Sequence, residues 1–360
     1  MTIHIFNPEH DISLANGMKR VTPPHAARQL RHDLGFIPAL WAHDGDMVLV
    51  EDKAHAERAY DRVRQAASRI TGMKSGDVSF IENADLRGIT ADSVSPWGWD
   101  YSVRASLATS IVNPEVLPSD ESLADISRLS HRRTAATLLP LLQFPGTTGS
   151  AVCCTSRGEV IEALWNAGGD AVFKAPWSSS GRGVRFVTRS IDDHTMRWVI
   201  NILKKQHAIM VEPRYRRVID FGMEFESHGD GTAAYSGLSL FTTANGAYTG
   251  NVLATESRKS EKLSRYVSAD LLANIRSVVC SRAFSALTSS YRGPFGIDMM
   301  VVASPDRDGF LVHPCVEINL RRTMGHLALS LSPSDDDIEG VMQVVYEDKF
   351  KLRVSRQALS

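Results

Sequence analysis

Lys174 and the loop that follows it are the residues of this sequence whose types and spacing first suggest chemistry. The segment 172–187 reads VFKAPWSSSGRGVRFV, which predicts an apolar strand carrying the lysine, a six-residue Ser/Gly/Arg loop, and an apolar strand leading back. The backbone N–H groups of such a loop can surround an anion, and the lysine can reach the same charge. The pattern therefore favours a loop that covers phosphates, with a flexible surface hairpin as the alternative.

Three oxygen-bearing side chains near the end of the sequence suit a metal ion. Two strongly apolar strands are predicted over 296–303 and 310–319, and they carry Asp298, Glu317 and Asn319. Because side chains alternate between the faces of a strand, these three would project from the same face of a hairpin. Oxygen ligands suit Mg²⁺, which keeps positions open for phosphate oxygens. Two acids on the solvent side of an edge strand are the alternative.

This metal site depends on the register of the hairpin. A symmetric turn over 304–309 would pair Ala303 with Phe310. Counting back from that pair, Asp298 would lie opposite Cys315. A slip of one residue would turn Asp298 to the other face of the sheet.

Two arginines follow the second strand directly. Alternation places Arg321 on the predicted metal face, and we prefer it over Arg322 for that reason. Its guanidinium could neutralise a transferring phosphate or hold a substrate carboxylate through two hydrogen bonds. A surface charge is the alternative.

The beginning of the chain predicts an α/β unit. A strand over 2–6 is followed by a polar loop at 7–11, a helix over 24–34 and a strand-like run over 36–41. This order favours a parallel sheet, in which ligands lie beyond the carboxyl ends of the strands. The loop at 7–11 is therefore a candidate substrate site, with a polar turn as the alternative.

The later elements are predicted from apolar spacing. A strand is expected over 208–212, and strands and turns follow from residue 221. One long helix is expected over 268–289 and a closing helix over 335–350. The three aspartates at 335–337 would then be favourable charges at a helix N-terminus.

The length and composition of the sequence limit the classes of function that are possible. With 360 residues the chain is expected to form two or three packed units. Its 40 basic and 41 acidic residues nearly cancel, so no nucleic-acid partner is indicated. The sequence begins without a signal-peptide pattern and contains no run long enough to span a bilayer, so we expect a cytoplasmic protein without a membrane partner.

In combination, the segments resemble the ATP-grasp superfamily of carboxylate-amine ligases. The lysine strand with its loop at 172–187 is similar to the family's lid. The strand and turn IMVEPRY at 209–215 resembles the hinge that holds adenine. GIDMMVV at 296–302 and VEINLRRTMG at 316–325 resemble its magnesium strands. The amino-terminal unit is similar to that of bacterial ATP-grasp proteins.

The resemblance implies a fold of the α/β class with three parts. A parallel α/β domain on the substrate side would span 1–125, and a small α+β lid subdomain would span 126–212. A mostly antiparallel subdomain, which carries the metal and the nucleotide, would span 213–350.

The resemblance also implies ATP and Mg²⁺ as cofactors and a role for each matching residue. Lys174 would bind the α- and β-phosphates, and the loop at 178–183 would close over the γ-phosphate. Arg321 would meet the transferring phosphate or the acyl group, while the basic residue that starts the lid is either Arg132 or Arg133, with Arg133 preferred. The implied nucleotide contacts are Arg133, Lys174, Ser179, Ser180, Gly181, Gly183, Val211, Glu212 and Asp220, and the implied metal ligands are Asp298, Glu317 and Asn319.

The activity that the resemblance implies is ATP-dependent joining of a carboxylate to an amine through an acyl phosphate. The substrates would be small molecules or peptides. A small-molecule kinase on the same scaffold and a non-catalytic nucleotide-binding regulatory protein are the alternatives. The sequence leaves the oligomeric state open, a homodimer included.

Overall fold

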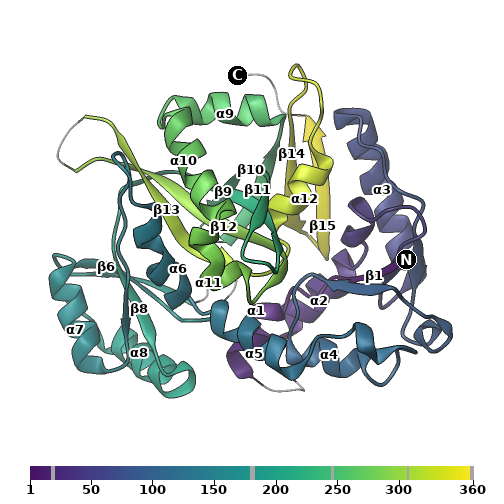
Figure 1. The fold of residues 1–360 in the computed structure, drawn as a ribbon, viewed down its shortest axis with the longest axis horizontal. Coiled ribbons are helices and arrows are strands. Elements are labelled where there is room, and N and C mark those ends of the chain that lie inside the picture. The colour runs from purple at the N-terminus through teal and green to yellow at the C-terminus, as the bar shows by residue number, and fades with distance from the viewer. Residues whose placement is uncertain (18–20, 179–182, 245–246, 306–307, 357–360) are drawn as a thin grey trace.

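The computed structural model describes residues 1–17, 21–178, 183–244, 247–305 and 308–356 of the chain. Within these residues the strands form three sheets, two of four strands and one of seven. In Figure 1 the seven-stranded sheet occupies the centre, with a small unit at its lower left and the amino-terminal unit at its right. No helix in the described part of the chain is both long and apolar enough to cross a membrane.

The amino-terminal sheet is parallel throughout, as the alternation of strands and helices predicts. In spatial order its strands are β3 (Ser79–Ile81), β2 (Met47–Leu49), β1 (Thr2–Ile5) and β4 (Ser93–Pro96). Its helices are α1 (His10–Asn16), α2 (His25–Leu34), α3 (Lys53–Thr71) and α4 (Tyr101–Leu107), with 3₁₀ turns η1 (Ile37–Leu40), η2 (Asp85–Gly88) and η3 (Pro114–Val116).

The strand expected over 36–41 is wrong, because these residues form the 3₁₀ turn η1 and the next strand is β2. Pro38 lies at the start of that turn, and all four residues of η1 are buried. A short apolar run that is buried on every side does not alternate, so periodicity cannot separate a buried turn from a buried strand.

The small unit is an antiparallel sheet with a helix pair. In spatial order its strands are β5 (Val152–Cys154), β8 (Ile209–Pro213), β6 (Asp170–Lys174) and β7 (Val184–Thr188). Its helices are α7 (Arg157–Asn166) and α8 (Asp193–Gln206), which begin at the N-caps Ser156 and Asp192. All four strands contribute residues to one apolar core, which includes Cys154 of β5 and Val211 of β8. The strand that was expected to carry the lysine is therefore present, together with its neighbouring strands.

The large sheet is antiparallel and contains seven strands in the described residues. In spatial order they are β13 (Phe310–Asn319), β12 (Arg292–Ala303), β9 (Arg217–His228), β10 (Ala233–Ala244), β11 (Ala247–Leu253), β14 (Gly340–Tyr346) and β15 (Phe350–Arg356). Its helices are α5 (Asp120–Leu129), α6 (Arg133–Leu138), α9 (Glu256–Ser264), α10 (Ala269–Cys280), α11 (Ser285–Thr288) and α12 (Met324–Leu331), with 3₁₀ turns η4 (Leu139–Leu142) and η5 (Arg282–Phe284).

One face of the large sheet is apolar and packs against helices. Phe221, Met223 and Phe225 of β9 belong to a core that also contains the apolar residues of α5, α6 and α10. Because these three residues alternate with Gly222 and Glu224, the opposite face of the same strand is polar. The large sheet therefore has a core face and a face that is available for chemistry.

Two helix predictions for the second half of the chain are wrong. The helix expected over 268–289 ends at Cys280, because Ser281 leaves the helical conformation and its hydroxyl accepts a hydrogen bond from Ala283 N–H, which starts the turn η5. The residues expected to form a helix over 335–350 instead form β14 and the turn before β15. β14 is paired on both sides, with β11 and β15, so tertiary pairing decides its structure.

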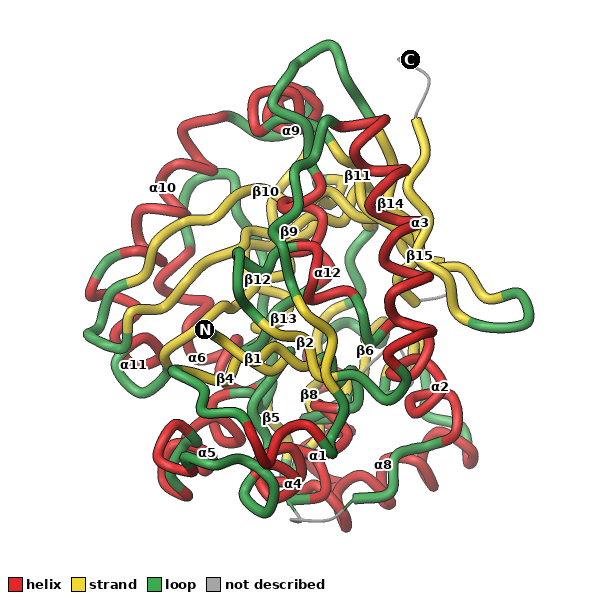
Figure 2. The backbone as a smooth tube through the Cα atoms, turned by 90° about the vertical axis from the view of Figure 1, so that its right-hand side faces the viewer, coloured by secondary structure: helices red, strands yellow, loops and turns green. Residues whose placement is uncertain are grey.

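The carboxy-terminal hairpin β14–β15 packs against the amino-terminal unit. Strand β15 contacts α2 and α3, and Figure 2 shows α3 running alongside β14 and β15. Leu352 and Val354 share one core with Phe36 and Val63. The two ends of the chain are therefore joined in one hydrophobic core.

Candidate active site

The polar face of the large sheet carries the acids singled out from the sequence. Asp298 of β12 pairs directly with Glu317 of β13, so the two side chains leave the sheet on the same face. Asn319 pairs with Gly296, and its Nδ2 donates a hydrogen bond of 3.2 Å to Asp298 Oδ2. The three expected metal ligands therefore lie together.

The register of this hairpin differs from the expected one. Ala303 pairs with Phe310, but an irregularity between Asp298 and Met300 brings Glu317, not Cys315, opposite Asp298. Because this change amounts to two residues along β13, it preserves which face each side chain occupies.

A third acid, Glu224 of β9, completes this group. It is 3% exposed, and its Oε2 accepts a hydrogen bond of 2.8 Å from Thr323 Oγ1. Two glycines make room for its side chain, because a Cβ at Gly296 would lie 2.5 Å from Glu224 Oε2 and one at Gly325 would lie 1.8 Å from Oε1. An acid between the apolar residues Met223 and Phe225 is the sequence signal that could have identified it.

The crowding of carboxylates changes the acidity of Asp298. Burial and the nearby negative charges of Glu317 and Glu224 raise the pKa of Asp298 to about 7, although Arg321 and the hydrogen bond from Asn319 partly oppose this change. Each of these acids favours a bound cation or proton, because like charges in a partly buried site repel.

Asp298→Asn is expected to stabilise the unliganded protein more at high pH than at low pH. The folded state holds the Asp298 proton up to about pH 7, whereas the unfolded chain releases it near pH 4, so this carboxyl weakens folding increasingly between those values. The variant should therefore gain about 4 kcal/mol in unfolding free energy relative to wild type on going from pH 4 to pH 8. Urea unfolding at both pH values, without metal or nucleotide, measures the difference.

The control for this measurement is Asp270→Asn, which alters an exposed aspartate in the first turn of α10. Its unfolding free energy should follow the wild-type pH dependence. If the unfolding free energy of Asp298→Asn also follows the wild-type pH dependence, the inference that burial and nearby carboxylates raise the pKa of Asp298 is wrong.

The small sheet brings a lysine and a glutamate to the same place. Lys174 Nζ donates a hydrogen bond of 2.6 Å to Glu212 Oε2, and the two residues are 8% and 5% exposed. β6 and β8 are adjacent antiparallel strands with Val172 opposite Glu212, so residues 174 and 212 share one face of this sheet. A buried ion pair of this kind holds each charge in position for a ligand.

Arg132 links the two sheets. Its Nη2 donates to Glu317 Oε1 at 2.7 Å, while its Nη1 donates to the Ala175 carbonyl at 2.5 Å and to Ser178 Oγ at 2.8 Å. Burial alone would lower the pKa of this guanidinium, but Glu317, Glu212 and Asp11 outweigh it and raise the pKa. Arg132 thus lies between the end of the lysine strand and the acids of the large sheet.

Cys315 and His313 of β13 lie between the same two groups. Burial raises the pKa of the Cys315 thiol, and the negative charges of Glu212 and Asp298 raise it further. The cysteine is therefore close to an acid of the small sheet and to an acid of the large sheet. His313 is 1% exposed, and neither of its ring nitrogens has a hydrogen-bond partner among the residues that the structure describes. Burial and the nearby Lys174 charge lower its pKa to about 3, which leaves the ring neutral.

The sequence alone did not identify His313, because the residues around its ring come together only in the folded structure. Tyr215 packs edge-on against its ring, with the ring centroids 5.5 Å apart. A Cβ at Gly149, whose φ is +130°, would lie 2.8 Å from His313 Nε2. His313 therefore stands in a tight enclosure with unused hydrogen-bonding capacity.

The nucleotide contacts predicted at Arg133, Val211 and Asp220 stay predictions. Arg133 is exposed, so of the two arginines Arg132 is the one that the structure brings to the acids. The Asp220 carboxylate accepts hydrogen bonds from Arg217 and Thr243. Val211 is buried in the middle of the small sheet, where it is paired on both sides.

The glycine-rich loop is described only at its ends. Gly183 is required there, because a Cβ at this position would lie 2.2 Å from Ser178 Oγ. Trp177 fixes the first end, since its N–H and its indole N–H donate to Gln206 and to the Ser127 carbonyl. The expected phosphate contacts Ser179, Ser180 and Gly181 lie outside the described residues.

Arg321 connects this site to the amino-terminal unit. It donates two hydrogen bonds to the Asp11 carboxylate, 3.3 Å from Nε to Oδ1 and 3.0 Å from Nη2 to Oδ2. Burial alone would lower the pKa of Arg321, but the negative charges of Asp11, Glu317 and Asp298 outweigh it and raise the pKa. The polar loop at 7–11 is therefore linked to the Asp298 group through Arg321.

No protein-family model matches the sequence, and no curated protein matches it either. Solved structures do match. Biotin carboxylase from Campylobacter jejuni, solved as a β-γ-ATP complex, is 13% identical, and the match covers 95% of this chain and 75% of that one with a TM-score of 0.50. N5-carboxyaminoimidazole synthetase from Staphylococcus aureus, solved with ADP, is 11% identical over 96% of this chain and 82% of that one, with a TM-score of 0.47.

Of these two, the biotin carboxylase match decides the fold, because it reaches a TM-score of 0.50 over nearly the whole chain. The chain has the ATP-grasp fold. The predicted ATP-grasp architecture is confirmed in its parallel sheet, its small antiparallel sheet and its large antiparallel sheet. Within this ATP-grasp fold, the Lys174 pair and the Asp298 group belong to the two antiparallel sheets, and Arg132 joins them.

Proposed function

We propose that the protein is an ATP-dependent ligase that joins a carboxylate to an amine through an acyl phosphate. One observation carries this proposal. Lys174 and Glu212 of the small sheet lie near Asp298 and Glu317 of the large sheet, and Arg132 donates both to Glu317 and to the carbonyl of Ala175, the residue after Lys174. A cation on one side and paired acids on the other are what a metal-bound triphosphate requires.

The nucleotide would lie between the two antiparallel sheets. Lys174 would leave Glu212 to bind phosphate oxygens, because a phosphate carries more negative charge than one carboxylate. His313 would supply hydrogen bonds from a neutral ring to a part of the nucleotide that enters its enclosure, since both nitrogens are unused. The biotin carboxylase and the synthetase that share the fold were solved with such nucleotides, which supports ATP as the ligand.

The donor set on the large sheet fits Mg²⁺. Asp298 and Glu317 offer carboxylate oxygens and Asn319 an amide oxygen, which are the ligands that a hard cation prefers. The raised pKa of Asp298 shows that these acids repel one another, and a divalent cation would remove that repulsion. The metal would neutralise charge on the phosphates, and Arg132 would exchange its contact with Glu317 for a contact with the nucleotide.

The substrate carboxylate would bind at Arg321. Asp11 already places a carboxylate on this guanidinium through two hydrogen bonds, so the geometry for a carboxylate ligand is present. The loop at 7–11 lies beyond the carboxyl end of β1, where ligands bind in parallel sheets. The amino-terminal unit would therefore provide the substrate side of the site.

The chemistry would proceed in two steps. A carboxylate oxygen would attack the γ-phosphorus, the bond to the β-phosphate oxygen would break, and ADP would leave. The amine would then attack the acyl carbon, inorganic phosphate would leave, and the amine would lose a proton to form the amide. Lys174, Arg132 and Arg321 would stabilise the charge that develops on the phosphates, because positioned charges provide most of the catalysis in phosphoryl transfer.

The test begins with thermal shift of the wild-type protein in ATP, MgCl₂ and a panel of amino acids and short peptides. Acids and amines that raise the melting temperature are then assayed for ADP release. We expect ADP release to require both an acid and an amine, and we expect hydroxylamine to replace the amine and trap a hydroxamate. A stable phosphorylated product formed without an amine would instead identify a kinase. ATP binding without turnover on any substrate pair would overturn the enzymatic proposal.

A further inference from the structure

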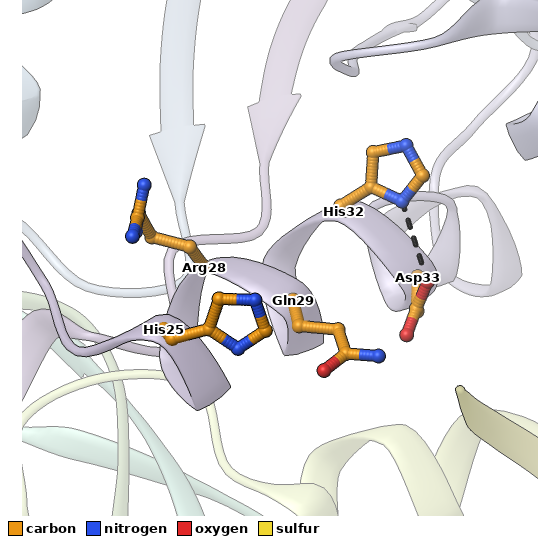
Figure 3. A pocket seen from close by; sticks show the side chains of 5 residues that line it. All are labelled: His25, Arg28, Gln29, His32 and Asp33. Atoms are coloured by element: carbon orange, nitrogen blue, oxygen red, sulfur yellow. Dashed lines mark hydrogen bonds and ion pairs between the residues drawn. The ribbon is translucent and has the colours of Figure 1, made fainter. Parts of the chain in front are cut away.

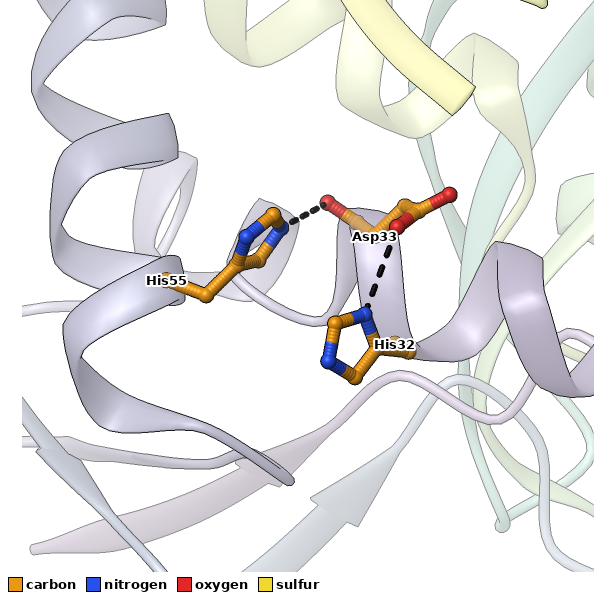
Figure 4. Close-up of side chains that lie close together, drawn as sticks. All are labelled: His32, Asp33 and His55. Carbon is orange, nitrogen blue, oxygen red and sulfur yellow. Dashed lines mark hydrogen bonds and ion pairs between the residues drawn. The ribbon is translucent and has the colours of Figure 1, made fainter. Parts of the chain in front are cut away.

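Two histidines and an aspartate meet on the amino-terminal unit, where α2 and α3 approach each other. His32 and Asp33 come from the last turn of α2, and His55 comes from the first turn of α3. One donor atom from each residue lies within 4.8 Å of the other two. Figure 4 shows His32 and His55 on two sides of Asp33, each with a ring nitrogen turned toward one of its oxygens.

The contacts of this cluster place both rings around the same residue. His32 Nδ1 lies 3.3 Å from Asp33 Oδ1, and His55 Nε2 lies 3.4 Å from the Asp33 carbonyl oxygen. The two ring centroids are 4.9 Å apart and the rings are tilted by 34°. Each ring nitrogen thus occupies a position from which it can hold either a proton or a metal ion.

Structural contacts fix two of the three residues before any ion binds. The Asp33 side chain is 6% exposed, and its Oδ2 accepts a hydrogen bond of 2.9 Å from Phe350 N–H of β15. His55 lies in the capped first turn of α3, where its N–H donates to Asp52 Oδ1 at 2.9 Å. His32 is 42% exposed, so the cluster can be reached from solvent.

The end of α2 favours a cation, and Arg31, the other basic residue of its last turn, is already paired with Glu9 and Glu51. The C-terminal end of a helix carries partial negative charge from its unpaired carbonyl groups, and His32 and Asp33 lie at that end of α2. A pocket of about 390 Å³ runs along α2 beside them. Figure 3 shows that Arg28, the arginine of this pocket, extends from the earlier part of the helix, away from Asp33, while Gln29 and His25 add polar side chains.

We propose that His32, Asp33 and His55 form a binding site for a divalent transition-metal ion of the Zn²⁺ class. Two imidazole nitrogens and one carboxylate oxygen are the ligand types that Zn²⁺ takes, with water in the fourth position. A donor set with two imidazoles disfavours Mg²⁺, which prefers oxygen. The site is therefore chemically distinct from the Asp298 group, and it does not depend on the proposed function.

A bound ion would link three parts of the chain. It would join α2 to α3 directly, and through Asp33 it would hold the hydrogen bond to β15. Because an ion that binds the folded state alone raises its stability, the structure assigns this site a role in fastening the amino-terminal unit to the carboxy-terminal hairpin.

Cobalt titration of the full-length protein tests the site. Co²⁺ replaces Zn²⁺ in such sites and gives visible absorption that reports its ligands, so we expect a band that saturates at one equivalent and disappears when Zn²⁺ is added. His32→Ala and His55→Ala should each weaken Co²⁺ binding at least ~10-fold. The control is His194→Ala, which removes an exposed histidine of α8 and should bind as wild type does.

A second variant separates ligand loss from misfolding. Asp33→Asn keeps an oxygen that can accept the Phe350 N–H but removes the charge, so it should fold, as judged by circular dichroism, and yet bind Co²⁺ at least ~10-fold more weakly. Zn²⁺ should also raise the melting temperature of wild type and leave that of His55→Ala unchanged. Equal Co²⁺ affinity in wild type and all three variants, or no saturable band in wild type, would overturn the proposal.

Discussion

The double variant Asp298→Asn, Glu317→Gln is expected to lose substrate-dependent ADP release by about 10³-fold or more. These substitutions keep the size of both side chains but remove the two charges that face each other across β12 and β13. Without them, neither the metal nor the developing charge on the phosphates is stabilised, and that electrostatic stabilisation usually provides the largest share of catalysis. Initial rates of ADP release at saturating MgCl₂, with the acid and amine found by thermal shift, measure the loss.

The matched control is again Asp270→Asn, which removes an exposed charge from α10 and should keep wild-type turnover. Thermal shift with ATP shows whether the double variant still binds nucleotide. If the variant binds ATP and every measurable activity survives, the assignment of Asp298 and Glu317 as metal ligands is wrong.

Lys174→Met is expected to lower turnover by about 10²-fold and also to destabilise the protein. The lysine charge would be missing from the phosphates, which accounts for the loss of rate. In the unliganded protein the substitution leaves Glu212 buried without its partner, and breaking a buried ion pair costs about 3–5 kcal/mol. Initial rates and urea unfolding measure the two effects separately.

The double variant Lys174→Met, Glu212→Gln distinguishes these effects. Because it removes both charges, its unfolding free energy should lie closer to wild type than that of Lys174→Met, while its turnover stays low. Lys204→Met, which alters an exposed lysine on α8, should change neither quantity. Recovery of turnover together with stability in the double variant would show that Lys174 is structural and not catalytic.

Alternation along strands was enough to group the predicted metal ligands from the sequence. The predicted pairing of Asp298 with Cys315 is wrong by two residues, yet Asp298 and Glu317 share a face, because a shift by two keeps the parity of the strand. A shift by one would have separated them. Face assignments are therefore more robust than register assignments in a strand whose apolar residues fix which side is buried.

The residues that complete the site could not be predicted in the same way. Arg132 and Arg133 are adjacent, and only the docking of α6 against the lysine strand decides which one is buried. Glu224 pairs with Gly296, which comes 72 residues later in the sequence, and His313 feels the charge of Lys174 from the other antiparallel sheet. Both relations join segments that are distant in sequence, and no local spacing encodes them.

Local pattern also failed where tertiary pairing overrides propensity. Residues 340–346 form a strand because β11 and β15 pair with them on both sides, although the segment was expected to be helical. At Ser281 a single hydroxyl starts a new turn and divides the expected helix. The pairing of β14 lies outside the window in which periodicity is read, whereas the Ser281 bond is local but leaves no trace in the apolar spacing.

The packing of β15 against α2 and α3 has a consequence for biosynthesis. Residues 350–356 leave the ribosome more than 270 residues after α3, so the apolar side of the amino-terminal unit stays uncovered during most of translation. Nascent chains with uncovered apolar surface aggregate easily and are bound by chaperones. The amino-terminal unit of this protein should therefore complete its folding only after synthesis of the last hairpin, whatever the state of the small sheet.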